Sequence, residues 1–308
     1  MAVSLNRRDV LKGALGAFAA WTSSGVLSAQ RAAGGVRLTD QMALVDGGGS
    51  NVLAFLTGEG YVLVDGGAPK SFDQVMASLG ANAKVHTLFN THHHLDQTGN
   101  NERFSTEGTQ GTAIVAHKRT LEWMSADHWI QADERYERAR PKAARPTETF
   151  LTTGSLHTGG EQIDYGHLTL AHTNGDIYVH FRNANVLAVG DVASPLRDPA
   201  LDYVTGAWIG GRVDSMDVLL TLANEQTRIV PAYGPVMSKA EFKAERDVME
   251  EVRKRLFDQV REGDGPKDML ERGVLKGLAR TWNDPYKFLY DAAKGLWAHH
   301  DKLGPNVV

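Results

Sequence analysis

The stretch that most constrains this chain is a polar run, residues 90–99, which places three histidines and an aspartate within five residues. The histidines occupy positions 92–94, Asp96 follows them, and the apolar run 85–89 just before has the composition of a buried β-strand. Packing of a hydrophobic core gives no reason to gather so many imidazoles at one point. Imidazole nitrogens and a carboxylate at this density are the ligands that Zn²⁺ prefers. The sequence therefore predicts a metal site at the end of this strand.

The three adjacent histidines are not equivalent. In an extended turn, residues two apart project to the same side, so His92 and His94 form the expected ligand pair and His93 is assigned a supporting role. A usable zinc site needs a third ligand, and the best candidate is His172, which follows an apolar stretch and precedes a glycine turn. Asp191 also follows an apolar stretch and is the fourth candidate.

Composition narrows the classes of function. The chain has 308 residues, of which 42% are hydrophobic, a formal net charge of −4 and no cysteine. Without cysteine there is no disulfide and no thiolate-bound cluster, so any metal must be held by nitrogen and oxygen. A nucleic-acid partner is not expected, because phosphate backbones are bound by clustered Lys and Arg and the sequence has no long basic run. A small-molecule substrate is the expected partner.

Residues 1–30 have the pattern of an export signal. Arg7 and Arg8, with Leu11 and Lys12 behind them, are typical of a twin-arginine signal, and a short segment rich in Gly and Ala follows. That segment is too short to span a bilayer stably, so no membrane anchor is expected once the signal is removed. Cleavage near Ala29 and a periplasmic location are expected, and an ordinary amphipathic first helix is the alternative.

Beyond residue 30, short apolar runs alternate with turn residues and helical periodicity. The expected strands are 42–45, 51–57, 61–64, 85–89, 112–116, 148–151, 167–171, 177–182, 186–189 and 228–230. The expected helices are 70–79, 117–124, 215–223, 239–263 and 285–300. Two β-then-α halves predict an α+β sandwich of two sheets with helices outside, over residues 31–240. Residues 125–146 interrupt that rhythm and are interpreted as an inserted helical flap, and residues 241–308 as C-terminal helices packed on the domain.

The order and spacing of the candidate ligands resemble the metallo-β-lactamase superfamily. Its signature is His-x-His-x-Asp-His, then a distant His, an Asp, and a final His in a Pro-Gly-His-Gly-Pro-like turn. The matching residues here are His92, His94, Asp96, His172 and Asp191. The resemblance extends over residues 42–235 and implies a four-layer αβ/βα sandwich with the metal site at one edge. It also implies that His92, His94 and His172 hold a first metal, with Asp191 bridging to a second.

Two positions depart from that signature. Gln97 stands where the superfamily has the last His of the first motif, and Tyr233 stands where it has the final His. The resemblance would make Asp96, Asp191 and these two residues the ligands of the second metal. A neutral amide and a phenol with a pKa of about 10 are poor substitutes for imidazole at zinc. We therefore expect one tightly held Zn²⁺ and a second position that is weak or empty; a harder ion, or iron with a tyrosinate ligand, is the alternative.

The resemblance implies a hydrolase that attacks an acyl carbon, with β-lactams, lactones and thioesters as consistent substrates. Asp96, freed from a second metal, is expected to orient water or accept its proton, and Tyr233 to donate a hydrogen bond or merely to fill space. Asp65 is expected to support a ligand, and Trp123, Trp129, Tyr203 and Trp208 are candidates for the pocket wall. The alternatives are a catalytically quiet ligand-binding member of the same fold and an iron-dependent redox variant.

Overall fold

The computed structural model describes residues 31–32, 35–108, 111–130 and 134–299, and its strands form two large sheets and one hairpin. The predicted export signal, residues 1–30, lies outside the described residues. In sheet order, the first sheet comprises β1 (Arg31–Ala32), β2 (Gly35–Arg37), β3 (Met42–Asp46), β4 (Asn51–Thr57), β5 (Gly60–Val64), β6 (Val85–Phe89), β7 (Ala113–His117) and β10 (Glu148–Phe150). The second comprises β11 (Thr153–Thr158), β12 (Glu161–His167), β13 (Ile177–Phe181), β14 (Val186–Gly190) and β15 (Arg228–Pro231).

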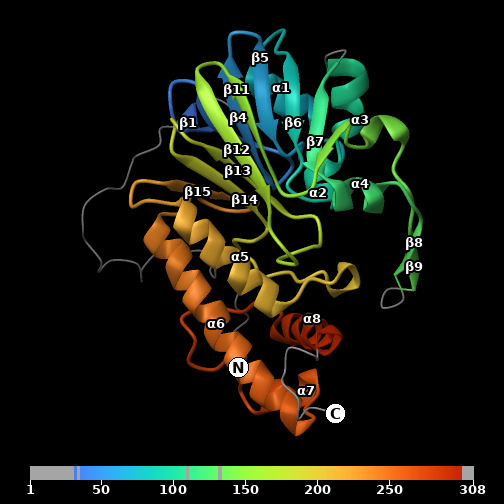
Figure 1. The fold of residues 1–308 in the computed structure, drawn as a ribbon, viewed down its shortest axis with the longest axis vertical. Coiled ribbons are helices and arrows are strands. Elements are labelled where there is room, and N and C mark those ends of the chain that lie inside the picture. Colours follow the sequence, from blue (N-terminus) through green and yellow to red (C-terminus); the bar gives the residue numbers. More distant parts are fainter. Residues whose placement is uncertain (1–30, 33–34, 109–110, 131–133, 300–308) are drawn as a thin grey trace, which may run out of the picture. The chain divides into compact units, whose positions relative to one another are not determined.

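Helices cover the outer faces of the two sheets (Figure 1). Those associated with the first sheet are α1 (Phe72–Leu79), α2 (Leu95–Thr98), α3 (Asn101–Arg103), the π-helical turn η1 (Phe104–Gly108) and α4 (Lys118–Met124). The others are α5 (Ile209–Leu222), α6 (Lys239–Glu262), α7 (Pro266–Glu271) and α8 (Pro285–Ala298), with short 3₁₀ turns η3 (Lys142–Ala144) and η4 (Tyr203–Thr205). Helices α7 and α8 lie beyond α5 and α6 (Figure 1).

Strand periodicity explains why the sheets stack into four layers. Successive residues of a strand face opposite sides, and in β4 both sides are apolar. Leu53 and Phe55 join the core between the two sheets, whereas Val52 and Ala54 join a second core under α1. Strands β12 to β14 contribute the other half of the central core, and the outer face of that sheet packs on α5 and α6, with α8 packed against these two helices. The predicted four-layer αβ/βα sandwich is confirmed.

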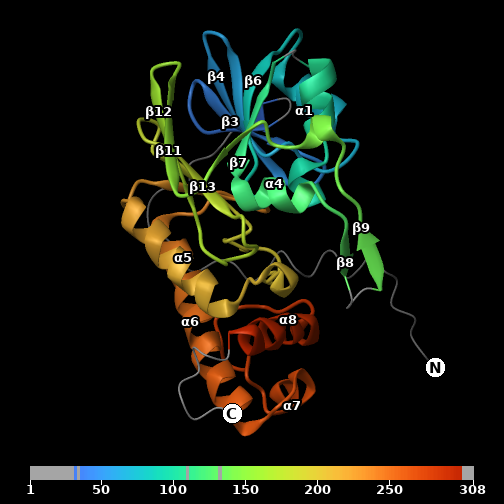
Figure 2. The same cartoon turned by 45° about the vertical axis from the view of Figure 1, so that its right-hand side comes forward.

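The predicted flap has a different structure from the one expected. Within 125–146 the chain forms a hairpin, β8 (His128–Ile130) with β9 (Arg135–Glu137), and of the residues described there only η3 is helical. The prediction of a helical flap was therefore wrong. Aromatic and β-branched residues favour an extended backbone, and here Trp129 and Tyr136 form a cross-strand ring pair at 4.9 Å while Ile130 is buried. The hairpin extends from α4 toward α8 in both views (Figure 2).

The topology brings the candidate site together at one edge. Strand β5 is parallel to β6, and β14 is parallel to β15, so the C-terminal ends of each pair lie side by side. Asp65 follows β5, the histidine run follows β6, Asp191 follows β14, and Tyr233 lies just after β15. Four segments distant in sequence thus deliver polar side chains to the same place.

One strand was misplaced in the sequence analysis. Residues 167–171 were expected to form a strand that ends at His172, but β12 ends at His167, which pairs with Ile177 at the start of β13. The residues between them form the connecting turn, in which Leu170 adopts a left-handed φ of 55°. His172 therefore lies on a turn, held because Asp176 Oδ2 accepts from the backbone N–H groups of His172 (2.6 Å) and Thr173 (2.7 Å).

Candidate metal centre

Three imidazoles converge where the sequence predicted a first metal. His92, His94 and His172 each offer one ring nitrogen, and the three nitrogens lie within 4.8 Å of one another. His92 and His172 are buried, with 1% and 3% of their surface exposed, and His94 is more open. Three imidazoles at this spacing match the protein ligands of a catalytic zinc site that keeps a fourth position for water.

The outward-facing nitrogen of each imidazole has a partner. His92 Nδ1 lies 3.1 Å from Thr91 Oγ1, His94 Nε2 lies 3.1 Å from Asp202 Oδ2, and His172 Nδ1 lies 2.9 Å from the carbonyl oxygen of Ala200. A carboxylate and a carbonyl can only accept, so they hold the ring proton of His94 on Nε2 and that of His172 on Nδ1. The remaining nitrogens are left with their lone pairs directed inward, as metal ligation requires.

The inward nitrogens provide the test of whether a metal fits. His92 Nε2 is buried and has no hydrogen-bond partner among the described residues. His94 Nδ1 lies 3.0 Å from His172 Nε2, and two lone pairs at that distance repel unless a proton or a cation lies between them. Burial, then the neighbouring imidazoles, holds the pKa of His92 well below its ordinary value, and burial followed by His94 lowers that of His172 to about 3. Burial lowers the pKa of His94, but its hydrogen bond with Asp202 and the nearby carboxylates outweigh burial and raise it. Three ring nitrogens that face one another with carboxylates close by fit a divalent cation.

Asp191 lies beside this group, as predicted. Its Oδ2 is 3.6 Å from His92 Nε2 and 4.0 Å from His172 Nε2. Burial, together with the charge of Asp96, raises the pKa of Asp191 to about 7, because two carboxylates face the same small volume. The backbone of Asp191 is held by Arg212, a fully buried side chain whose Nη1 donates to the Asp191 carbonyl oxygen at 2.8 Å.

Asp96 and Tyr233 form a pair that lies close enough to Asp191 to affect its charge. The Tyr233 hydroxyl donates a hydrogen bond to Asp96 Oδ2, and burial together with that bond raises the pKa of Tyr233, so the residue is a phenol. The Arg197 guanidinium lies 3.3 Å above the Tyr233 ring. Asn51 fixes the turn that carries Tyr233, since its Nδ2 donates to the carbonyl oxygens of Pro231 and Gly234 at 2.9 Å each.

Gln97 is fully buried in the first helical turn after the histidines. Neither its amide oxygen nor its amide nitrogen has a hydrogen-bond partner in the described part of the chain. Burying an amide without partners costs about 1–3 kcal/mol, so this side chain is not stabilised by the contacts that surround it. From its position beside Asp96 we expected this amide to hold Asp96 or a water; it makes no hydrogen bond to Asp96, and the contact with a water stays a prediction.

Asp65 supports the site one step further away than expected. Its carboxylate accepts from the Thr91 backbone N–H and from Thr91 Oγ1, both at 2.8 Å, and Thr91 in turn contacts His92. Burial raises the pKa of Asp65 well above its ordinary value. The carboxylate thus anchors the start of the histidine run, while the imidazole itself is reached through Thr91.

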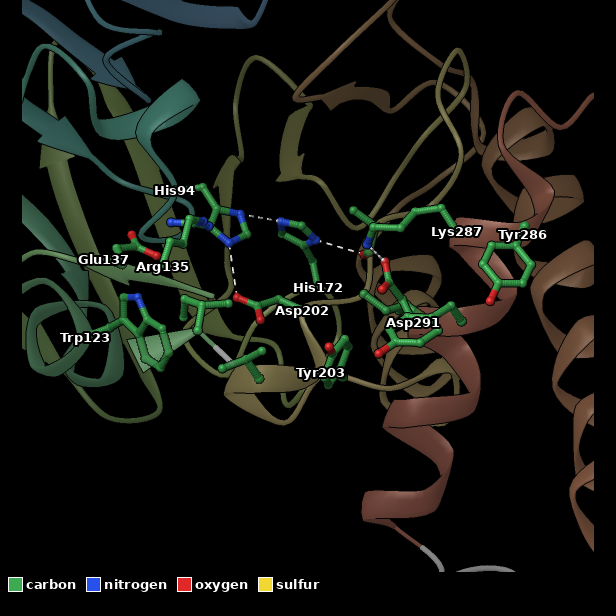
Figure 3. Close-up of a pocket in the computed structure, with 15 residues that line it drawn as sticks. His94, Trp123, Arg135, Glu137, His172, Asp202, Tyr203, Tyr286, Lys287 and Asp291 are labelled. Carbon is green, nitrogen blue, oxygen red and sulfur yellow. Dashed lines mark hydrogen bonds and ion pairs between the residues drawn. The ribbon is translucent and has the colours of Figure 1, made fainter. Parts of the chain in front are cut away.

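A pocket of about 460 Å³ opens next to His94 and His172 (Figure 3). Its walls come from α4, the β8–β9 hairpin, the segment 200–204 and α8. Trp123 and Tyr203 line it as proposed, but Trp129 is exposed on the hairpin and Trp208 packs against His299, so neither of these forms the wall. The remaining lining side chains with rings or charges are Arg135, Glu137, Asp202, Tyr286, Lys287, Tyr290 and Asp291.

Sequence reasoning missed Asp202 and the carbonyl of Ala200. Both lie in the long connection between β14 and α5, where no periodicity or motif distinguishes them from other loop residues. Burial raises the pKa of Asp202, but its hydrogen bond with His94 and the nearby imidazoles outweigh burial and lower it to about 2. An aspartate close to a predicted ligand in space but 108 residues away in sequence gives no local signal.

Comparison with known proteins agrees with this geometry. A family model described as the metallo-beta-lactamase superfamily matches residues 45–245, more than half of the chain. The chain belongs to the metallo-β-lactamase superfamily. A search of curated proteins returns no match.

Solved structures of other members share the fold. A metallo-beta-lactamase from Pontibacter korlensis has 19% identity and a TM-score of 0.56, with 70% of this chain and 98% of that one covered. The stereoselective inverting sec-alkylsulfatase Pisa1 from Pseudomonas sp. has 12% identity and a TM-score of 0.62, with 88% of this chain and 50% of that one covered. Thus the β-lactamase leaves out about a third of this chain, whereas the sulfatase match covers most of it. At these identities the likeness concerns the superfamily fold alone.

Proposed function

We propose that the protein is a metal-dependent hydrolase with one tightly held Zn²⁺ that acts on an acyl carbon. The observation that carries the proposal is the set of three imidazoles, His92, His94 and His172, whose inward nitrogens converge within 4.8 Å while their outward nitrogens are held by other groups. Zinc bound by three imidazoles supplies hydroxide at neutral pH, because it lowers the pKa of its water to about 7.

Asp96 and Tyr233 are the groups of this chain that we assign to proton handling. Asp96 Oδ2 already accepts from the Tyr233 hydroxyl, so the pair is oriented by its own hydrogen bond. In the proposed reaction Asp96 accepts the proton of the attacking water, and Tyr233 turns its hydrogen bond to the oxygen that becomes negative. The Arg197 guanidinium above the Tyr233 ring helps to hold that ring in place.

The pocket supports a substrate with an uncharged or weakly charged ring or chain. Its rings come from Trp123, Tyr203, Tyr286 and Tyr290. Its two basic side chains, Arg135 and Lys287, are accompanied by three acidic ones, Glu137, Asp202 and Asp291, and Lys287 is paired with Asp291 at 2.5 Å. β-Lactams, lactones and thioesters fit this description. A phosphodiester is disfavoured, because its hydrolysis usually relies on two metals and the second position here lacks both imidazoles.

Turnover by the metal-stripped and the reloaded protein tests the proposal. Wild-type protein is freed of metal, assayed against a chromogenic β-lactam, aryl esters, lactones and acyl thioesters, and assayed again after one equivalent of Zn²⁺ is added. We expect hydrolysis of at least one class that depends on the added zinc. Tight binding of zinc with no turnover of any class would instead support the catalytically quiet ligand-binding alternative.

Export by the twin-arginine route remains part of the proposal and rests on residues 1–30 alone. Among the helices of the described residues, none is long and apolar enough to cross a membrane. The presence of Arg7 and Arg8 before a short apolar segment is the only support for the export route.

A further inference from the structure

The geometry points to Asp202 as the positioning residue of the metal centre, acting through His94. The inference rests on the metal site of the proposed function. Asp202 Oδ2 lies 3.1 Å from His94 Nε2 (Figure 3). It also lies 3.7 Å from His93 Nε2, so one carboxylate faces two adjacent imidazoles of the histidine run. The side chain of Asp202 is only 16% exposed, which protects these contacts from competition with water.

The role follows from the two nitrogens of His94. A neutral imidazole carries one N–H, and a ring can bind a metal only through the other nitrogen. Because the Asp202 carboxylate can only accept, it holds the proton on Nε2 and leaves Nδ1 free toward His92 and His172. The same hydrogen bond fixes the plane of the ring and makes Nδ1 a stronger donor to a cation.

Asp202 is itself held by a turn that also orients His172. The Asp202 backbone N–H donates to the carbonyl oxygen of His172 at 2.9 Å, and Thr205 Oγ1 donates to the carbonyl oxygen of Asp202 at 2.9 Å. Two residues earlier, the Ala200 carbonyl accepts from His172 Nδ1. The segment 200–205 therefore fixes the orientation of two of the three imidazoles, although it supplies no ligand to the proposed metal itself.

The C-terminal helix α8 packs on the continuation of this turn. His299 Nε2 donates to the Gly206 carbonyl oxygen at 2.9 Å, and the His299 ring stacks on Trp208 at 4.7 Å. At Gly295 the approach is so close that a Cβ atom would lie 2.7 Å from the Ala207 carbonyl oxygen. Helix α8 lies outside the 45–245 segment matched by the superfamily model, so this part of the support is an addition to the shared domain.

The same side chains could instead bind a cation directly, and this alternative must be distinguished from the positioning role. His93, His94 and Asp202 also form a group whose ligand atoms lie within 4.8 Å of one another. His93 is buried, and neither ring nitrogen has a hydrogen-bond partner among the described residues. A cation of their own would make Asp202 a ligand instead of a positioning residue, and the metal stoichiometry of the variants distinguishes the two.

The test compares Asp202→Asn with wild type by metal affinity, without any need for a substrate. Zn²⁺ affinity is measured by competition with a chromogenic chelator, the Co²⁺-loaded forms are compared by absorption spectroscopy, and the melting temperature of the metal-free forms is recorded. We expect a roughly 10–100-fold loss of affinity for the first equivalent, an altered Co²⁺ spectrum and an unchanged metal-free melting temperature. Asp202→Glu, which keeps a carboxylate, is expected to recover part of the affinity.

Thr205→Val is the second variant, in case Asp202→Asn does not fold. It keeps the Asp202 side chain and removes the hydroxyl that anchors its backbone, and we expect a several-fold loss of zinc affinity. His93→Phe is the matched control, because it removes the other imidazole on Asp202 and should leave the first equivalent unchanged.

Three results would overturn the inference. The first is an unchanged zinc affinity in Asp202→Asn, or in Thr205→Val if Asp202→Asn does not fold. The second is a lower melting temperature of the metal-free protein with no change in zinc affinity. The third is the loss of a second metal equivalent in both Asp202→Asn and His93→Phe while the first equivalent stays tightly bound. If wild type binds zinc tightly but hydrolyses nothing, the proposed function fails and the role of Asp202 stands.

Discussion

The two halves of the metal centre differ in how their side chains are held by neighbouring groups. On one side, His92, His94 and His172 each have an outward nitrogen held by a neighbour and an inward nitrogen directed at a common point. On the other side, Asp96 and Tyr233 bond to each other, and the amide of Gln97 is buried without a partner. This contrast is the reason why we propose one tightly held metal, with a carboxylate–phenol pair at the second position.

The largest expected effect comes from removing one of the three converging imidazoles. His94→Ala removes both the inward donor Nδ1 and the partner of Asp202. We expect loss of the bound metal and of all metal-dependent hydrolysis, with a fall in rate of at least about 10³-fold. Elemental analysis of the purified variant and the substrate panel measure the two effects. His157→Ala, at an exposed histidine remote from this group, is the control and should retain both.

Restoring imidazoles at the second position should give both halves of the centre the ability to bind zinc. The double variant Gln97→His with Tyr233→His restores imidazole at both positions where this chain departs from the superfamily signature. We expect the zinc content of the purified protein to rise from about one to about two per chain, because imidazole is a far better zinc ligand than an amide or a phenol. Each single variant should bind the second zinc more weakly than the double variant does. Two tightly bound zinc ions in the wild type would contradict the contrast between the halves.

A smaller change tests what the carboxylate–phenol pair does. Tyr233→Phe removes the hydroxyl that donates to Asp96 and keeps the ring under Arg197. We expect an unchanged metal content and a fall in kcat of roughly 10²-fold with little change in KM, as for loss of one donor to a developing oxyanion. Steady-state kinetics on the best substrate separates the two parameters. An unchanged kcat would show that Tyr233 only fills the space of the absent imidazole.

The same contrast explains how much of the site could be anticipated from sequence. His92, His94 and Asp96 stand within five residues at the end of a strand, so their convergence is local. His172 and Asp191 could be placed because each follows an apolar stretch, even though the turn before His172 was mistaken for a strand. Asp202 could not, because its function depends on the path of a loop whose conformation is set by η4 and α8. Supporting contacts made by loops have no periodicity to detect.

A similar limit applied to the fold. The hairpin of β4 and β5 and the long helix α6 follow patterns that continue over many residues, and both were predicted closely. The strand β11 was missed because it is an edge strand whose residues, such as Ser155 and His157, are polar and largely exposed. The pairing of β11 with β12 supplies the order that its own sequence lacks. A polar edge strand such as β11 therefore lacks the hydrophobic pattern by which strands are recognised.

The smallest expected effect concerns the loss of stability at acid pH, and it separates a contribution of the fold from one of the metal centre. His117 and His167 stack at 3.8 Å with nearly parallel rings, outside the metal centre. Burial, followed by the neighbouring His167, lowers the pKa of His117 to about 4, against an unfolded value of about 6.5. Between these values the unfolded chain binds a proton that the folded chain does not, so stability is full above pH 6.5 and declines as the pH falls toward 4.

His117→Asn removes the titrating ring and keeps a residue able to cap α4, as His117 does by accepting from the Arg119 backbone N–H. We expect the melting temperature of the metal-free wild type to fall more than that of the variant across this range, by a few degrees at most. Equal slopes would place the acid sensitivity elsewhere, and His157→Asn, at an exposed histidine, should follow the wild type.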